Sequence, residues 1–488
     1  MTHPDFRAAV LSGRHIVRGI RSWLMLGTAL LMSGCASFSP DGGMSVVTAT
    51  VSQDLDKEAA ALRTPDDAAA ARSTTARLLA KPLSADAAVQ IALLNNRGLQ
   101  AAYNELAIAE ARAVESSLPP NPAISLSRIA GSVEVEVERK IVANVLALAT
   151  LPMRSQIAAD RFRQAQIIAL SETLRIAAET RRAYYRAVAA RELAGFLAQA
   201  QSGAATAAKF ATRLGETGGM NKLDQAREQV FYADLTAQLA STRQRAASER
   251  ETLIRAMGLW GDDLGFKMAA ALPPLPSRPR ALPDIESEAV RRHVDLRIGR
   301  LELDALAKSY GLTQATRFIN VLDAGVSAKT TREKATGEKI RDRGFDVELQ
   351  IPIFDFGEVR VREAEATYMH AVNRLTERAV NVRSEARDAY RSYRSAYDIT
   401  MHYQKEVLPL RKIISDETLL RYNGMLIDVF ALLAEARQRI AATTAAIEAK
   451  RDFWLAATNL STAVMGGGVA ARSETTLASG ASNQPAQH

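Results

Sequence analysis

The chain has 488 residues, of which 47% are apolar, 6% aromatic and 24% charged, and its net charge is +8. Length alone leaves room for two or three ordinary domains, so the composition has to separate the fold classes. Alanine supplies much of the apolar content, which suits closely packed helices better than a bulky globular core. Basic and acidic residues are mixed along the chain, without the basic stripe and interleaved aromatics of a nucleic-acid-binding surface.

Residues 1–34 have the organisation of an export signal. Arginines from Arg7 to Arg21 precede an apolar run at 23–32, which is too short to span a bilayer but fits the hydrophobic region of a signal peptide. The only cysteine follows in Leu31-Met32-Ser33-Gly34-Cys35, which resembles a bacterial lipobox. That resemblance implies lipidation of Cys35 and, with Ala36 next, delivery to the outer membrane. An incidental cysteine beside an ordinary cleavage site is the alternative.

The two halves of the chain resemble each other. Leu151-Pro152-Met153 is matched by Ile351-Pro352-Ile353, and Gly219-Met220 by Gly424-Met425, at offsets near two hundred residues. Matches in register predict a duplication. We expect a flexible lipidated segment at 35–82, one repeat at 83–272, a proline-rich linker at 273–283, a second repeat at 284–465 and a disordered tail at 466–488.

Each repeat is predicted to contain a helix, a strand pair and a long helical hairpin. The helices are expected at 87–118 and 286–315, the strand pairs at 121–151 and 318–353, and the hairpins at 156–257 and 359–464. No proline lies between Pro152 and Pro273, so a helix over 156–213 would be about 85 Å long. Apolar spacings of three and four favour coiled coils, with a plain bundle as the alternative. Arg181 and Lys450 interrupt these seams, so the packing there must be either hydrated or paired.

The strand pairs are marked by strict alternation of apolar and polar residues. Phe345, Val347 and Leu349 alternate with carboxylates, and residues 322–329 alternate in the same way. A polar loop is predicted between them at 330–342, whereas the boundaries in the first half stay open among 123–129, 133–138 and 141–151. Strands of this length fit a membrane barrel, and an aqueous sheet with one buried face is the alternative.

The segment Ile351-Pro352-Ile353-Phe354-Asp355-Phe356-Gly357, together with the duplication and strand pairs, resembles the TolC-like outer-membrane efflux proteins over about 83–465. The resemblance implies a mainly α fold with a small membrane β-barrel portion. Duplicated long-helix hairpins of three protomers would form an α-barrel tunnel, and each protomer would supply four barrel strands. It also implies an efflux duct in the outer membrane, lipid-anchored, with a periplasmic extension, a periplasmic adaptor and an inner-membrane pump as partners.

The same resemblance implies a gate at the periplasmic tip. The turns at 213–222 and 422–427 resemble adaptor-contact loops, with Gly215, Gly218, Gly219, Gly424 and Met425 as their contact residues. Asp428 matches one gate aspartate, and the position of a second holds Ala431. Asp224 and Tyr422 match two members of a latching hydrogen-bond network whose arginine is missing. The alternative for both aspartates is a favourable charge at a helix N-terminus.

No catalytic, cofactor or metal site is predicted. None of the six histidines belongs to an H-E-x-x-H pair, and Gly466-Gly467-Gly468 lacks the Lys-Ser/Thr of a phosphate loop. The competing interpretation is a lipid-anchored periplasmic coiled-coil adaptor or scaffold without a pore. Such a protein is expected to have a single hairpin flanked by all-β domains.

Overall fold

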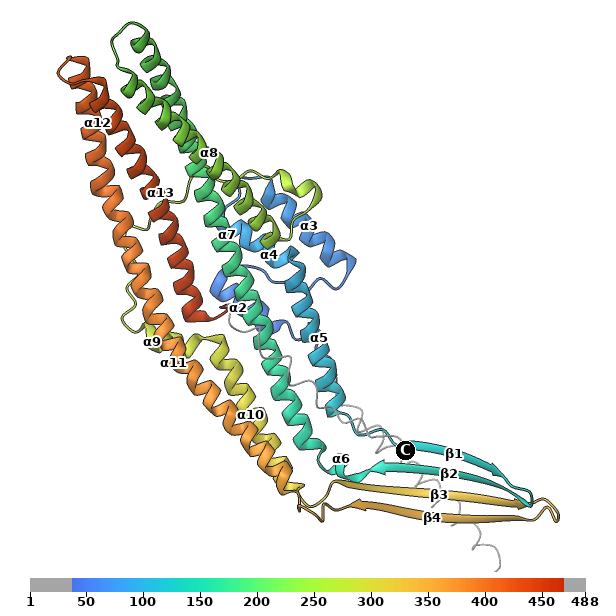
Figure 1. Ribbon diagram of the computed structural model, residues 1–488. Helices are drawn as coiled ribbons and strands as arrows, with labels where there is room; N and C mark the ends of the chain where they lie inside the picture. The colour runs from blue at the N-terminus through green and yellow to red at the C-terminus, as the bar shows by residue number, and fades with distance from the viewer. Residues whose placement is uncertain (1–36, 469–488) are drawn as a thin grey trace, which may run out of the picture. The chain divides into compact units, whose positions relative to one another are not determined.

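The computed structural model describes residues 37–468 as a set of helices and one four-stranded sheet (Figure 1). The predicted signal peptide and Cys35 lie outside these residues. The chain divides into two compact units. One comprises the described residues up to Gly43 with Ala107–Arg163 and Leu301–His370, and it contains the sheet. The other comprises Met44–Leu106, Gln164–Arg300 and the described residues from Ala371 on.

Both halves of the chain run through the same order of elements, which confirms the predicted mainly α fold with duplicated hairpins and four strands. The first half has α4 Ala85–Asn95, α5 Arg97–Ser117, β1 Ala123–Ala130, β2 Glu134–Asn144, α6 Val145–Ala149, α7 Leu151–Glu216 and α8 Lys222–Met257. The second has α9 Ile285–Arg292, α10 Val294–Ala315, β3 Val321–Glu333, β4 Lys339–Gln350, α11 Glu358–His402, α12 Leu408–Asn423 and α13 Val429–Met465. None of the described helices has a stretch long and apolar enough to cross a bilayer.

The first helix of each repeat is broken at one residue, which the sequence analysis missed. Asn96 separates α4 from α5 with φ −64° and ψ 114°, and His293 separates α9 from α10 with φ −64° and ψ 119°. The Asn96 side chain caps the second helix by accepting a hydrogen bond from Leu99 N (3.0 Å). The same kink at the same place in both repeats supports the duplication independently of the sequence matches.

The prediction of a flexible segment at 35–82 is wrong over most of its length. This segment contains α2 Ser45–Leu55 and α3 Pro65–Leu79. Thr64 and Asp67 form a reciprocal capping box at the start of α3, and Pro65 occupies its first turn. Val47 and Val51 are fully buried, so α2 is anchored by apolar contacts. At the other end of the chain, the predicted disordered tail starts too early, because Gly466 and Gly467 are buried.

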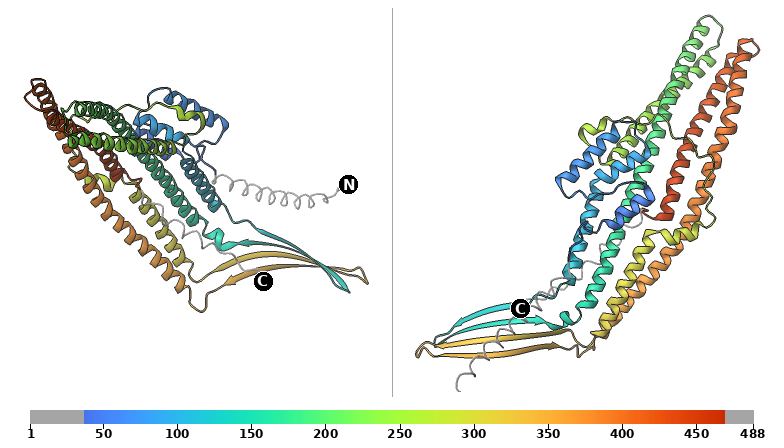
Figure 2. Two further views of the ribbon diagram at one scale, coloured as in Figure 1. Left: turned by 45° about the horizontal axis from the view of Figure 1, so that its top comes forward. Right: turned by 180° about the vertical axis from the view of Figure 1, so that it is seen from behind.

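The four strands form one antiparallel sheet in the order β1-β2-β3-β4, visible in every view (Figure 2). The two repeats meet at the β2–β3 pair, which runs in register from Glu134↔Glu333 to Asn144↔Asp323. The predicted loop at 330–342 is wrong, because β3 continues to Glu333 and β4 begins at Lys339. In the first half the strand ends at Asn144, whose side chain caps α6 by accepting a hydrogen bond from Ala147 N (2.6 Å).

The long helices pack through two apolar clusters that share Trp454. One cluster gathers side chains of α4, α7 and α8, and the other gathers side chains of α9, α11 and α13. The Trp454 ring stacks on Tyr185 (5.1 Å between centroids) and meets Phe453 edge-on (5.2 Å). The two basic residues that interrupt the seams are paired as expected: Lys450 donates to Leu272 O (2.7 Å) and Arg181 to Asp86 (3.1 Å).

The first helical stretch of the hairpin predicted at 359–464 contains an irregular turn. A π-helical turn, Tyr403–Val407, separates α11 from α12. Pro409 follows it, and proline has no N–H to donate and its ring clashes with the carbonyl four residues earlier in an ideal helix. The wider turn accommodates this proline without ending the helix.

The motif 351–357 forms the junction between β4 and α11. Phe356 (φ 47°) and Gly357 (φ 75°) are both left-handed, and Asp355 Oδ1 accepts a hydrogen bond from Gly357 N (3.1 Å). A Cβ on Gly357 would lie 2.1 Å from the carbonyl oxygen of Arg317. The glycine is therefore required both by its backbone conformation and by the close approach of the α10–β3 connection.

We expect Gly357→Ala to destabilise this junction by about 1–3 kcal/mol, because it combines a left-handed alanine with a backbone clash. Hydrogen exchange of β4 and the start of α11 measures the effect. Gly311→Ala is the control, because Gly311 lies within α10 with no atom within 4 Å of a new Cβ. It should be neutral or stabilising, and equal losses in both variants would contradict this explanation of the motif.

Candidate functional site

The pairing register of the sheet separates its side chains into two faces. Ile124, Ile141, Val326 and Phe345 are aligned across the four strands, so every second residue from each of them belongs to the same face. We call this the apolar face. It carries Ile124, Leu126, Arg128 and Ala130 of β1; Val135, Val137, Arg139, Ile141 and Ala143 of β2; Leu322, Ala324, Val326, Ala328, Thr330 and Arg332 of β3; and Lys339, Arg341, Arg343, Phe345, Val347 and Leu349 of β4.

The opposite face is dominated by carboxylates, and we call it the acidic face. Its charged residues are Glu134, Glu136, Glu138, Asp323, Glu333, Asp342, Asp346 and Glu348, with only Lys140 and Lys329 as bases. Both lysines are paired, Lys329 with Glu136 (2.7 Å) and Lys140 with Asp346 (3.7 Å). The remaining carboxylates give this face an excess of negative charge.

Both outer strands have an unpaired edge. Each residue of β1 and β4 is exposed, and each of these strands pairs on one side only within the described sheet. Large apolar side chains are exposed on these strands, with Ile124 at 76% and Phe345 at 70%. An exposed apolar edge strand invites pairing with another strand, so this sheet is built to be completed by something outside the single chain.

Large apolar residues are also exposed at the end of the sheet where the strands join helices. Phe318 precedes β3, and Phe354 and Phe356 follow β4, with Phe354 98% exposed. The Arg317 guanidinium lies 4.8 Å from the centre of the Phe318 ring. Aromatic rings flanking an apolar sheet face are typical of strands that cross a membrane, where they lie at the water interface.

The tip turns that link α7 to α8 and α12 to α13 share one helix-terminating motif. Gly219 N donates to Leu214 O (2.8 Å) and Gly218 N to Gly215 O (3.1 Å). In the second turn Leu426 N donates to Arg421 O (2.9 Å) and Met425 N to Tyr422 O (2.9 Å). Both are Schellman-type ends, in which a left-handed residue closes the helix.

The structural alignment of the two turns pairs Gly218 with Met425, two residues away from the alignment of Gly219-Met220 with Gly424-Met425 expected from the sequence. Met425 has φ 59° and its side chain is 93% exposed. A left-handed methionine costs free energy that the glycine in the other turn avoids. With this exposure the side chain has little packing among the described residues to offset the strain.

The predicted gate residues lie at these tips, each engaged locally. Asp428 is the N-cap of α13 and accepts a hydrogen bond from Ala431 N (2.9 Å). Asp224 lies in the first turn of α8, where it pairs with Arg227 (3.0 Å) and accepts from Asn221 Nδ2 (2.6 Å). Tyr422 is half-buried near the end of α12. These local contacts are those of aspartates that stabilise a helix N-terminus. A gate role for the three residues is a proposal, taken up below.

We expect Met425→Gly to stabilise the α12–α13 turn by about 1 kcal/mol, because it relieves a left-handed methionine without removing a packed side chain. Gly218→Ala is the matched opposite change, since its φ is 77° and a new Cβ meets no atom within 4 Å. It should destabilise the first turn by a similar amount. Hydrogen exchange of the two tips measures both, and protection that falls in Met425→Gly would refute the strain argument.

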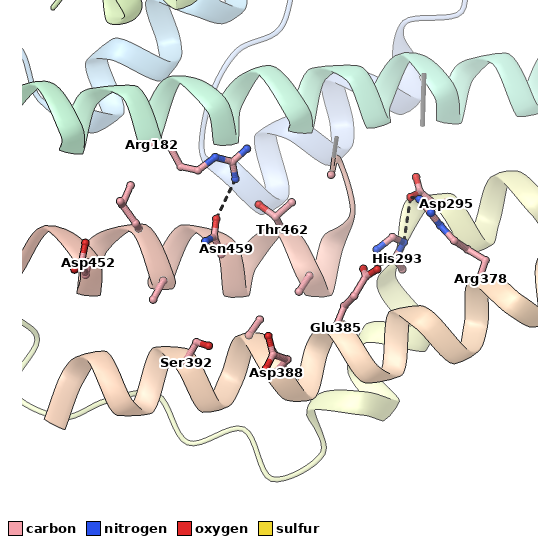
Figure 3. Close-up of a pocket in the computed structure, with 15 residues that line it drawn as sticks. Arg182, His293, Asp295, Arg378, Glu385, Asp388, Ser392, Asp452, Asn459 and Thr462 are labelled. Atoms are coloured by element: carbon pink, nitrogen blue, oxygen red, sulfur yellow. Dashed lines mark hydrogen bonds and ion pairs between the residues drawn. The ribbon is translucent and has the colours of Figure 1, made fainter. Parts of the chain in front are cut away.

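A cavity of about 550 Å³ lies among α7, α11, α13 and the α9–α10 break (Figure 3). Arg378 is ion-paired with Asp295, and Arg182 donates to Asn459 (3.3 Å). Burial lowers the pKa of His293, against the opposing effect of Asp295, whose carboxylate lies 3.9 Å from its Nδ1. Glu385, Asp388 and Asp452 also line the cavity. No cluster with metal-binding geometry occurs among the described residues.

Comparison with known proteins agrees with this architecture. Residues 286–414 match the sequence model of a family described as "Outer membrane efflux protein". No curated protein matches the chain. The structure resembles the Campylobacter jejuni CmeC outer membrane channel (TM-score 0.66, 15% identity, 78% of this chain and 86% of that chain). It also resembles the open-state MtrE outer membrane channel of Neisseria gonorrhoeae (TM-score 0.64, 16%, 78% and 88%) and VceC of Vibrio cholerae (TM-score 0.62, 14%, 78% and 96%).

The fold is therefore that of an outer-membrane channel protein, with duplicated helical hairpins and a strand pair in each repeat. The family match lies in the second repeat, so a sequence model and the fold both show a resemblance to outer-membrane efflux proteins.

Proposed function

We propose that the chain forms the outer-membrane duct of a tripartite export system. The observation that carries this proposal is the open sheet, which is apolar on one face, acidic on the other and unpaired at both edges. In lipid every backbone polar group needs a partner, so such a sheet is stable there only when several copies close a barrel. Its apolar face then contacts lipid and its acidic face lines water.

The number of strands makes closure straightforward. Because the sheet has four antiparallel strands, β1 and β4 run in opposite directions, and β4 of one copy can extend antiparallel pairing to β1 of the next. A homotrimer would pool twelve strands, an even number as in bacterial outer-membrane barrels. The helical hairpins would then extend into the periplasm.

The remaining parts of the proposal rest on the sequence. Lipidation of Cys35 would add an anchor in the outer membrane, and the tips would contact a periplasmic adaptor that connects the duct to an inner-membrane pump. The exposed, strained Met425 supports such a contact, because a side chain kept at a conformational cost without internal packing fits a partner better than a structural role. We propose Asp224, Tyr422 and Asp428 as gate residues at the same tips, and Gly215, Gly218, Gly219 and Gly424 with Met425 as adaptor contacts. A scaffold without a pore would not account for the sheet.

Purified protein should insert into planar bilayers as a stable trimer and conduct ions with a preference for cations, since the acidic face would line the pore. Glu134→Gln combined with Glu138→Gln should reduce this preference, measured as the reversal potential in a salt gradient. These two carboxylates have no ion-pair partner in the described structure, so the sheet itself should be preserved.

Asp262→Asn with Asp263→Asn is the matched control, because it removes two exposed carboxylates from the short helix Gly261–Gly265 outside the sheet and hairpins. Its reversal potential should equal that of the original chain. A protein that stays monomeric and adds no conductance would contradict the proposed function. Conductance that ignores Glu134 and Glu138 would contradict the assignment of the acidic face to the pore.

A further inference from the structure

The apolar face changes character along the strands. At the end of the sheet joined to the helices it carries Leu322, Leu349, Ala324 and Val347, followed by the aligned residues Ile124, Ile141, Val326 and Phe345. Toward the hairpin loops every charged residue on this face is basic. These are Arg128, Arg139, Arg332, Lys339, Arg341 and Arg343, and we call them the distal basic cluster.

The basic residues of this cluster occupy three successive aligned rows. Arg139 and Arg343 share the first row with Ala328, Arg128 and Arg341 share the second with Thr330, and Arg332 faces Lys339 in the last. Rows on one face of a strand are about 6.8 Å apart, so the cluster extends over about 14 Å. It begins directly beside the exposed row that contains Phe345.

No residue of the distal basic cluster forms an ion pair within the described part of the chain. The sheet's eight carboxylates all lie on the acidic face, where two of them hold Lys140 and Lys329. Glu338, in the hairpin loop, is the acidic residue next to Lys339 in sequence. Directly opposed like charges such as Arg332 and Lys339 are destabilising in a sheet. Six cations gathered on one face without anions of their own therefore call for anions from outside.

The position of the cluster identifies the kind of anion. It continues a surface that contacts acyl chains in the proposed function, on which this inference rests, and it lies at the end of the sheet opposite the helices. That end would reach the outer leaflet. Arginine side chains can lay their apolar stems along such a surface while their guanidinium groups reach the headgroups. Five of the six residues are arginines, which bind phosphate oxygens in a bidentate manner.

We propose that the distal basic cluster binds the phosphate groups of a phosphorylated glycolipid of the outer leaflet. The extent of the cluster favours a lipid with more than one phosphate on a large headgroup, because an ordinary headgroup layer is only about 5–8 Å thick. Binding supplies the missing counterions and fixes the depth of the sheet in the membrane. The lipid then binds the sheet specifically through its phosphates, in addition to surrounding it with acyl chains.

The test uses the assembled full-length protein in detergent, titrated with lipopolysaccharide and with the same lipid after enzymatic removal of its phosphates. The original chain should bind the phosphorylated form more tightly, and increasing salt should weaken the binding. Arg341→Gln combined with Arg343→Gln should weaken it roughly tenfold or more, given about 1 kcal/mol per basic residue at an anionic surface. Arg341→Lys with Arg343→Lys should retain part of the affinity.

Arg243→Gln with Arg245→Gln is the matched control, because these exposed arginines have the same spacing but lie on α8. Its affinity should be unchanged. Equal affinity for the two lipid forms, or equal weakening in the control, would overturn the proposal. Oligomer mass and bilayer conductance are measured on the same samples, so a variant that no longer assembles is distinguished from one that assembles without binding lipid. If the original chain assembled but showed no conductance, that result would contradict the proposed function and not the lipid-binding proposal.

Discussion

The unpaired edges of β1 and β4 set the conditions for the rest of the molecule. An open sheet exposes rows of N–H and C=O groups along its edges. In the hydrocarbon of a membrane, each such group without a hydrogen-bond partner costs several kcal/mol of free energy, more than the apolar side chains of the edge strands gain. The chain has no described element that covers these edges with further β pairing. In the proposed function, assembly with other copies is therefore a requirement of the sheet, and the closed barrel explains the alternation of apolar and acidic residues.

The duplication explains how one chain supplies four strands to a continuous sheet. Each repeat contributes one strand pair, and the repeats join at β2 and β3 in an unbroken eleven-pair register. The helices repeat as well, down to the single-residue breaks at Asn96 and His293. The tips retain the same terminating hydrogen bonds but differ in the left-handed residue, which is glycine in one turn and methionine in the other. Conserved backbone geometry with altered side chains lets the two halves pack alike and still present different surfaces.

Much of this architecture could be predicted because it depends on local patterns: long stretches without proline, period-two alternation, and the motif that ends in Gly357. The wrong predictions concern the strand ends and the N-terminal helices, which these local patterns do not mark. Residues 330–342 look like a polar loop because neither face of the strand ends is buried, and this concealed the distal basic cluster. The helices α2 and α3 depend on tertiary burial of a few side chains, such as Val47 and Val51. The break at Asn96 combines its local cap with a tertiary hydrogen bond from Asn96 Nδ2 to Ala256 O (3.0 Å), and His293 is buried at the second break.

The most direct test of the account is disulfide cross-linking between chains in the membrane. A cysteine at Ser127 of β1 is combined with one at each position of β4 from 340 to 348, in a chain whose only natural cysteine is Cys35. Within one chain β2 and β3 separate these strands by about 14 Å, too far for a disulfide. Closure predicts cross-linked dimers and trimers, strongest at the even-numbered positions that share the acidic face with Ser127. Monomers at every position, or cross-links without that alternation, would contradict it.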